Sequence, residues 1–276
     1  MSLNNTYSFT IDITPDLLDL EKVLDSGQVF RWRKTKEGIY VPVMGYVSLL
    51  SQTTTQLTIA HNGPNDNFWK TYLDLNRDYA KLYQRFQALN SPLVTQSLEI
   101  AKGIRCPQQS FFESGIVGIT TQNNNIPKIS SSLEKLCGGE RETFPSPEQI
   151  LKTLEKDTCS LGYRVDYIKE FCVRYMSGAF DDLEKLCPLQ RAFDNLSPVF
   201  NKPTYKEIEK RLTAERGIGP KVAAIIALFS LGYVEAIPRD VWIKRAEEKG
   251  VVWDSEFAGI EQQFVFYATT HGLFDN

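Results

Sequence analysis

A lysine that follows a Gly-x-Gly turn is the side chain with the clearest potential for chemistry in this sequence. The segment after the turn, Val222 to Leu231, is apolar on nearly every face, as expected of a buried helix. Lys221 would then lie at the N-terminus of a buried helix. The positive field of a helix N-terminus and desolvation both lower the pKa of a lysine. A neutral amine is a nucleophile that can form a Schiff base.

Asp240 follows nineteen residues after Lys221 and can return to the same site. Simpler interpretations remain open, because a lysine at a helix start is commonly only solvated and Asp240 could merely cap a helix that begins at Val241. The turn favours chemistry, since the free N–H groups around Gly217 and Gly219 would form an anion site with the helix dipole. The spacing is not that of a Walker loop. An amine beside a phosphate site suggests chemistry on a nucleic acid.

Composition sets the limits of the function. The chain has 276 residues, 42% hydrophobic and 24% charged, which is typical of a soluble globular protein with one large or several small domains. No apolar run approaches the length of a membrane span, and the polar N-terminus lacks a signal-peptide core, so we expect a cytoplasmic protein. Net charge is −3, but the stretch 202–245 holds nine Lys or Arg against five Asp or Glu. The net charge does not itself indicate nucleic-acid binding, but this local excess implies salt-sensitive binding with few phosphate contacts.

Cysteine and histidine usage argues against a metal centre. None of the five cysteines forms a Cys-x-x-Cys pair, so zinc and thioredoxin-type sites are disfavoured and reduced core thiols are expected. The two histidines, His61 and His271, offer little to a catalytic triad or a His-rich site. We therefore expect no metal and no cofactor, and catalysis that rests on lysine, aspartate, glutamine and backbone groups.

The first 95 residues predict an antiparallel sheet domain. Alternating apolar and polar residues indicate strands, and two helical segments, Asp66–Leu73 and Asp78–Phe86, are expected to cover one sheet face. A short helix is expected at Asp16–Leu24. The predicted strands are Tyr7–Ile13, Val29–Arg33, Ile39–Met44, Tyr46–Ser51 and Gln56–Ala60.

Residues 96–276 predict a larger helical domain, which gives an α+β protein. Gly and Pro punctuate short connections between the helices, and a helix-hairpin-helix is expected at about 205–231. The predicted helices are Gln108–Thr121, Pro127–Leu136, Ser146–Lys152, Tyr163–Ser177, Leu183–Cys187, Tyr205–Glu215, Lys221–Leu231, Val241–Glu248 and Gly259–Thr270.

Other short motifs have both a structural and a functional interpretation. The run of asparagines at 123–125 is a polar capping loop, or a set of short amides that enter a duplex. Tyr163 and Arg164 start a helix, or act as an aromatic wedge and its partner. Gln262 and Phe266 share a helix face, as surface amide and core ring or as the edge reader and stacking ring of a heterocycle. Gly27 lacks a side chain, so a ligand could approach its carbonyl closely.

Five motifs occur together and in order: GQVFRW from 27, QNNNI from 122, LGYR from 161, GIGPKVA from 217 and PRDV from 238. Each is weak alone, but the set is specific. From the strand after Gly27 to the helix with Phe266, the chain resembles the 8-oxoguanine DNA glycosylase/AP lyase family of helix-hairpin-helix glycosylases. The hairpin and the aspartate alone would indicate only the superfamily.

The resemblance implies a role for each matching residue. Lys221 corresponds to the Schiff-base nucleophile and Asp240 to the essential carboxylate. Gly27 corresponds to the residue whose carbonyl accepts a hydrogen bond from N7–H, which 8-oxoguanine has and guanine lacks. Gln262 corresponds to the reader of the Watson–Crick edge, and Phe266 to the stacking ring.

The resemblance also implies DNA contacts. Asn123 corresponds to the residue that fills the vacated space, Tyr163 to the wedge and Arg164 to a reader of the orphaned cytosine. The sequence departs from eukaryotic members at three positions, which suggests a prokaryotic member. Lys128 replaces an arginine that contacts cytosine, and a lysine lacks the bidentate fork, so the preference for cytosine should be relaxed.

The other two departures lie near the lysine and the aspartate. Ile225 replaces a cysteine on the other face of the base, and Trp242 replaces a histidine that contacts phosphate. The implied fold is a TATA-binding-protein-like sheet domain on a helical glycosylase domain. The implied activity is excision of 8-oxoguanine from duplex DNA by a monomer, followed by β-elimination. A glycosylase for another damaged base and a non-catalytic DNA-binding module remain alternatives.

Overall fold

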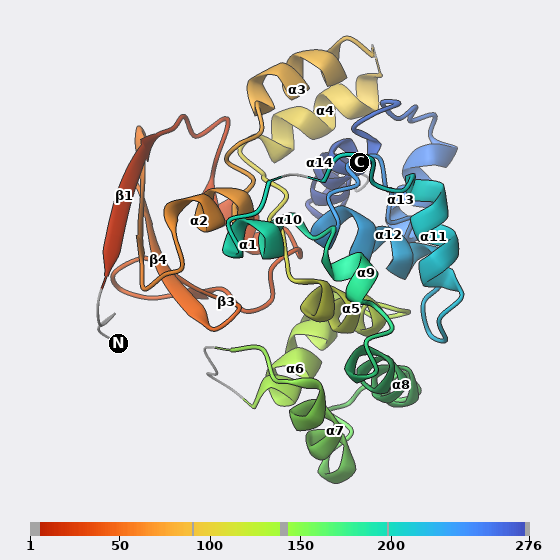
Figure 1. The fold of residues 1–276 in the computed structure, drawn as a ribbon. Coiled ribbons are helices and arrows are strands. Elements are labelled where there is room, and N and C mark those ends of the chain that lie inside the picture. The colour runs from red at the N-terminus through yellow and green to blue at the C-terminus, as the bar shows by residue number, and fades with distance from the viewer. Residues whose placement is uncertain (1–5, 90, 139–142, 198, 274–276) are drawn as a thin grey trace.

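The N-terminal part of the chain forms a five-stranded antiparallel sheet. The computed structural model describes residues 6–89, 91–138, 143–197 and 199–273. The strand order is β1-β5-β4-β3-β2, at one side of the molecule in Figure 1. The central strands are registered so that Ile59 pairs with both Phe9 and Leu50, which places apolar side chains of neighbouring strands on one face. The strands are β1 (Tyr7–Asp12), β2 (Arg33–Lys34), β3 (Ile39–Val43), β4 (Tyr46–Gln52) and β5 (Gln56–His61).

Two helices and a returning segment share the core of the sheet. Helix α1 (Leu20–Asp25) is capped by Asp19, and α2 (Asp66–Tyr72) by Asn65. Fully buried Phe68 and Trp69 of α2 belong to the core that the sheet builds. Leu189 of α10 (Pro188–Phe193) joins the same core, so a segment far along the chain contributes to the core of the sheet domain.

A second group of helices unites both ends of the chain. It contains α3 (Tyr79–Gln87), α4 (Pro92–Ala101), α13 (Val241–Glu248) and α14 (Ala258–Thr270). Figure 1 shows α3 and α4 beside α14, away from the sheet. The expected position of α3 over the sheet was therefore wrong. Its buried rings, Tyr79 and Phe86, pack instead on Phe264 of α14.

The largest core surrounds helix α12. Every residue of α12 (Pro220–Ser230) from Val222 onward is buried, as the apolar composition predicted. Gly118 of α5 brings the two helices close, because a Cβ there would lie 3.0 Å from Val222 Cγ1. The other helices of this core are α5 (Phe111–Thr120), α6 (Ile126–Cys137), α7 (Pro147–Lys156), α8 (Arg164–Met176), α9 (Asp181–Glu184) and α11 (Tyr205–Thr213).

The α+β fold class is confirmed, with an N-terminal antiparallel sheet on a larger helical part. Local differences remain. Strand β2 holds only Arg33–Lys34, since the residues before it form the turn described below, and α4 and α10 were not expected. The domain boundary at residue 95 falls inside α4 and stays a prediction. No helix in the described ranges is long and apolar enough to cross a bilayer.

Candidate active site

A cavity of about 570 Å³ brings together segments that are far apart in the sequence. Its walls are the turn at Gly27, the asparagine loop after α5, the first turn of α12, the start of α13 and the inner face of α14. Most of the predicted site residues meet here. Those that line the cavity are Gly27, Asn123, Lys221, Ile225, Asp240, Trp242, Gln262 and Phe266.

Lys221 lies in the first turn of α12. Gly219 is the N-cap residue and makes no side-chain cap hydrogen bond. The Lys221 ammonium nitrogen is half-buried and lies 3.3 Å from the carbonyl oxygen of Thr121. Desolvation lowers the pKa of Lys221 below its ordinary value, and the charge of Asp240 opposes this shift without reversing it. The lowered pKa makes the neutral, nucleophilic amine more accessible than it is for a fully solvated lysine.

Asp240 performs two functions that the sequence presented as alternatives. Its Oδ1 accepts hydrogen bonds of 3.0 Å from the backbone N–H groups of Trp242 and Ile243, which makes it the N-cap of α13. The same carboxylate is the charge that acts on Lys221. Capping therefore fixes the carboxylate beside the amine.

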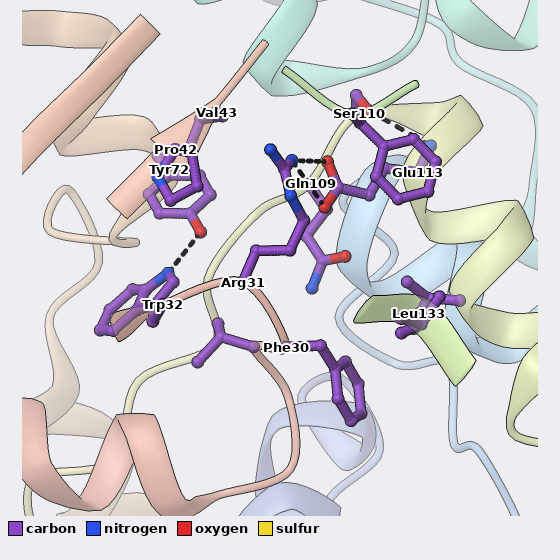
Figure 2. A pocket seen from close by; sticks show the side chains of 13 residues that line it. Phe30, Arg31, Trp32, Pro42, Val43, Tyr72, Gln109, Ser110, Glu113 and Leu133 are labelled. Carbon is purple, nitrogen blue, oxygen red and sulfur yellow. Dashed lines mark hydrogen bonds and ion pairs between the residues drawn. The ribbon is translucent and has the colours of Figure 1, made fainter. Parts of the chain in front are cut away.

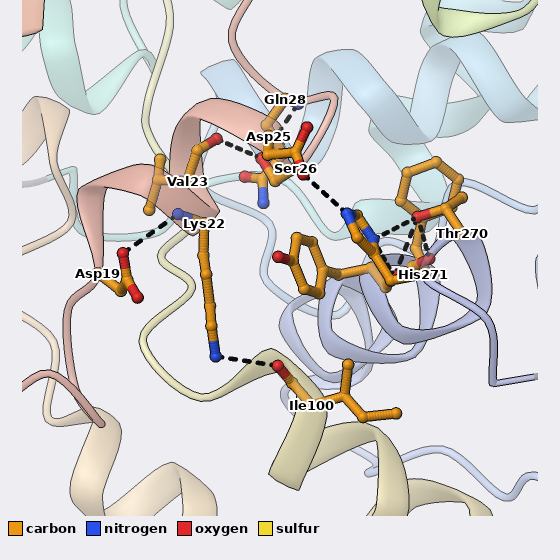
Figure 3. A network of polar contacts seen from close by, with 11 residues as sticks. Asp19, Lys22, Val23, Asp25, Ser26, Gln28, Ile100, Thr270 and His271 are labelled. Carbon is orange, nitrogen blue, oxygen red and sulfur yellow. Dashed lines mark hydrogen bonds and ion pairs between the residues drawn. The ribbon is translucent and has the colours of Figure 1, made fainter.

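The turn at Gly27 is attached on both sides. Gly27 adopts φ +72°, and a Cβ there would lie 2.8 Å from Ile126 Cδ1 and 3.8 Å from a ring carbon of Phe266. On one side, Asp25 pairs with His271 at the end of α14 at 2.9 Å (Figure 3). The His271 ring in turn stacks on Tyr267, with 3.8 Å between ring centroids.

The segment between Gly27 and β2 is fixed to helices α5 and α2. Arg31 makes two contacts with the carboxylate of Glu113 in α5, at 3.0 and 3.1 Å, next to a small cavity of about 20 Å³ (Figure 2). The indole of Trp32 donates to the Tyr72 hydroxyl at 2.7 Å. Arg31 and Trp32 of the GQVFRW motif therefore hold the turn in place, and the Gly27 backbone lines the cavity.

Helix α14 presents a ring and amides to the cavity. Phe266 is half-buried, and the Gln262 side chain is only 2% exposed. The Oε1 atom of Gln262 accepts a hydrogen bond of 2.5 Å from Gln263, a cavity residue that the sequence analysis missed. Its position three residues before Phe266, on the same face, was the available signal. Ile225 enters the cavity from α12.

The asparagine loop and the tyrosine lie together near the cavity. Asn123 adopts φ +44°, and its side-chain amide donates to the Tyr163 hydroxyl at 3.2 Å. Tyr163 is 48% exposed, so both side chains face solvent. Gln122 donates to the carbonyl oxygen of Gly217 at 2.8 Å, which joins the loop to the hairpin. Lys128 is exposed on the first turn of α6.

Arg164 behaves differently from the prediction. It is 8% exposed, and its guanidinium donates to the carbonyl oxygens of Gln122, Asn123 and Leu161. A buried guanidinium requires such partners, and here they direct it into the protein. This geometry does not fit a side chain that reaches an orphaned base. The structure instead makes Arg164 a support for the asparagine loop.

The remaining polar groups give no sign of a metal centre. No group of three or more His, Cys, Asp and Glu residues that could hold a metal ion occurs in the described part of the chain. All five cysteines are buried free thiols, as the sequence predicted. Trp242 is half-buried beside the guanidinium of Arg245, which lies 5.3 Å from the centre of the indole.

Comparison with known proteins identifies relatives of this chain in sequence and fold. The sequence model of the 8-oxoguanine DNA glycosylase N-terminal domain matches residues 10–114. N-glycosylase/DNA lyase OGG1 of Arabidopsis thaliana is 26% identical over 256 residues, which cover 85% of this chain and 67% of that protein. A probable N-glycosylase/DNA lyase of Methanothermobacter thermautotrophicus is 28% identical over 62% of this chain and 59% of its own length.

Solved structures agree with this relationship. MBOgg1 in complex with a low-affinity DNA ligand has a TM-score of 0.78 and 25% identity, with 96% of each chain covered. The 8-oxoguanine glycosylase/lyase of Clostridium acetobutylicum, bound to DNA with cytosine opposite 8-oxoguanine, has a TM-score of 0.77 and 22% identity, with 99% of each covered. The fold and the hairpin lysine define a helix-hairpin-helix DNA glycosylase. Within that class, the chain is similar to the 8-oxoguanine DNA glycosylases, whose N-terminal domain model matches residues 10–114.

Proposed function

We propose that this protein is a bifunctional DNA glycosylase and AP lyase that removes 8-oxoguanine from duplex DNA during base excision repair. The observation that carries the proposal is the position of Lys221. A lysine of lowered pKa lies beside a fixed carboxylate, on the wall of a cavity of about 570 Å³, a volume in the range of small-ligand pockets. An extruded purine nucleotide can therefore bring its sugar to the amine.

The chemistry begins at C1′ of the flipped nucleotide. The neutral amine of Lys221 forms a bond to C1′ as the glycosidic bond breaks, and the electrons of that bond leave with the base. Asp240 stabilises the positive charge that develops on the sugar. The sugar ring then opens to an imine on Lys221. Loss of a proton from C2′ expels the 3′-phosphate and cuts the strand.

Recognition of the lesion would use the two walls of the cavity. The Gly27 carbonyl accepts a hydrogen bond from N7–H, which guanine lacks, and a lost buried hydrogen bond is worth about 1–3 kcal/mol. Phe266 and Ile225 would enclose the base between apolar surfaces, and Gln262 would read its Watson–Crick edge. A Cβ added at Gly27 would lie 3.8 Å from a ring carbon of Phe266, so the turn and the ring are close enough to support a slot of this kind.

The DNA face would lie around the hairpin and the asparagine loop. We propose that Asn123 and Tyr163 occupy the duplex at the vacated position, which their exposure and mutual contact support. Gly217 and Gly219 would bind a phosphate through backbone N–H groups at the uncapped start of α12, as helix N-termini do.

The opposite strand would meet Lys128 and Trp242. Lys128 would contact the partner base, and Trp242 would donate to a phosphate. We propose that the protein acts as a monomer. A DNA substrate places the activity in the compartment of the genome, which is the cytoplasm of a prokaryote or the nucleus of a eukaryote.

Borohydride trapping tests the proposal. The protein is incubated with duplexes that carry 8-oxoguanine opposite each of the four bases, with sodium borohydride present. We expect a covalent adduct that disappears in Lys221→Gln, while Lys244→Gln, which removes another cavity cation, keeps it. The yields across the four duplexes measure how far Lys128 relaxes partner choice. DNA binding without any adduct would refute the imine and favour a monofunctional glycosylase or a DNA-binding module.

A further inference from the structure

Gln263 is a buried amide inside the base cavity to which no role has been given. It is 6% exposed, lines the cavity with Gln262 and Phe266, and donates through Nε2 to the Oε1 atom of Gln262 at 2.5 Å. Burying an amide costs free energy unless it is hydrogen-bonded. An amide pair of this kind in a cavity wall is therefore expected to have partners in the cavity's ligand.

Helix geometry places the two amides around the ring. At 3.6 residues per turn, Gln262 lies about 40° to one side of Phe266 around the helix axis and Gln263 about 60° to the other side. Both precede the ring by about one turn. A base that stacks on Phe266 would therefore present a single edge to both amides.

The hydrogen bond between the amides fixes their orientation. A primary amide offers a carbonyl acceptor and an N–H₂ donor, and a free amide could turn either group toward a base. Because Oε1 of Gln262 receives the Gln263 donor, the Nε2 atom of Gln262 is held on the other side. The second lone pair of Gln262 Oε1 stays available, and so does the carbonyl of Gln263.

We propose that Gln263 is a specificity-determining residue that selects purines with a 2-amino group. This inference rests on the proposed function. The edge of 8-oxoguanine offers O6 as an acceptor, followed by N1–H and the 2-amino group as donors. Gln262 donates to O6 and accepts from N1–H, and the Gln263 carbonyl accepts from the 2-amino group. The orientation set by Gln263 also keeps Gln262 from presenting the reversed pattern.

The test compares two lesions that differ only in the 2-amino group. Base release is measured under single turnover from duplexes with 8-oxoguanine and with 8-oxohypoxanthine, which lacks that group. Cleavage of a preformed abasic site is measured for every variant, because it needs Lys221 but no base recognition. Gln263→Leu removes the amide, Gln263→Asn withdraws it by one methylene, and Gln190→Leu makes the same chemical change on α10, outside the cavity.

We expect the unmodified protein to prefer 8-oxoguanine by about tenfold or more, the effect of one unpaired buried group. Gln263→Leu and Gln263→Asn should lower that preference severalfold while abasic-site cleavage persists, and Gln190→Leu should keep it. The preference should fall through a slower excision of 8-oxoguanine. If either Gln263 variant cleaves abasic sites and keeps the full preference, the assignment is wrong.

Two further results also decide the question. A protein without preference between the two lesions would overturn the role of Gln263 but leave the proposed function intact. A protein that cleaves abasic sites and releases neither base would instead refute the proposed function. If Gln263→Leu loses abasic-site cleavage as well, the Asn variant decides, since it keeps a polar group in the buried position.

Discussion

Replacement of Gly27 by alanine isolates the carbonyl that is proposed to read N7–H. The backbone adopts φ +72°, and the new Cβ would lie 2.8 Å from Ile126 Cδ1. A left-handed conformation costs a non-glycine residue about 1–2 kcal/mol, and the flexible end of Ile126 must shift. For a protein of this size, such a loss lowers the melting temperature by about 2–8 °C. We expect the turn to relieve the strain by rotating, which would move the Gly27 carbonyl away from the base.

The loss of that hydrogen bond should cost about 1–3 kcal/mol, or about 5- to 150-fold in the rate of 8-oxoguanine release. The assay measures base release and abasic-site cleavage in parallel under single turnover. Cleavage of the abasic site should stay within about twofold, since no base is present. Gly250→Ala is the matched control, because it has φ +90° with no atom within 4 Å of the new Cβ. Unchanged base release, or equal losses in both reactions, would refute the reading role.

Two pH dependences follow from buried groups. Desolvation lowers the pKa of Lys221 from 10.5, so the trapping rate should rise with pH and level off below that value; a rise that continues through 10.5 would contradict a neutral amine. Burial raises the pKa of Glu261 from 4.5 to about 7, so the folded state holds more protons than the unfolded chain within that window. The free energy of unfolding should therefore fall as pH rises from 4.5 through about 7. Glu261→Gln should flatten this slope in urea unfolding curves, and an unchanged slope would assign it to other groups.

Local patterns in the sequence predicted which segments form helices and strands better than they predicted what each element packs against. Helix α3 shows the limit, because its stripe of Tyr79, Leu82 and Phe86 indicated a buried face but not which surface buries it. The partner is Phe264, far along the chain. Helices α4 and α10 each begin at a proline, and their buried residues belong to different cores, that of the α14 group for α4 and that of the sheet for α10.

In the site, too, local motifs were predictable from the sequence, whereas contacts between distant segments were not. Lys221, Asp240 and Gly27 were predictable because each depends on a local motif: a hairpin, a cap and a turn. Arg164 was not, since its sequence position gives no information about the carbonyl oxygens of the asparagine loop that surround its guanidinium. Gln263 was hidden for a related reason. Its spacing from Phe266 was a signal in the sequence, but the folded cavity is what shows that both glutamines of α14 face the same space.

The uncapped N-terminus of α12 and the partial burial of Lys221 both favour the proposed reaction, although each is unfavourable for the folded state. Gly219 provides no side-chain cap, so the first N–H groups of the helix stay available to a phosphate, and a half-buried lysine in that field is favoured as the neutral amine. A carboxylate at the cap of α12 would satisfy those groups and hold Lys221 charged. Asp240 instead caps the next helix. Its charge opposes the lowering of the Lys221 pKa without restoring the ordinary value, so the carboxylate lies near the amine without cancelling the effect of burial.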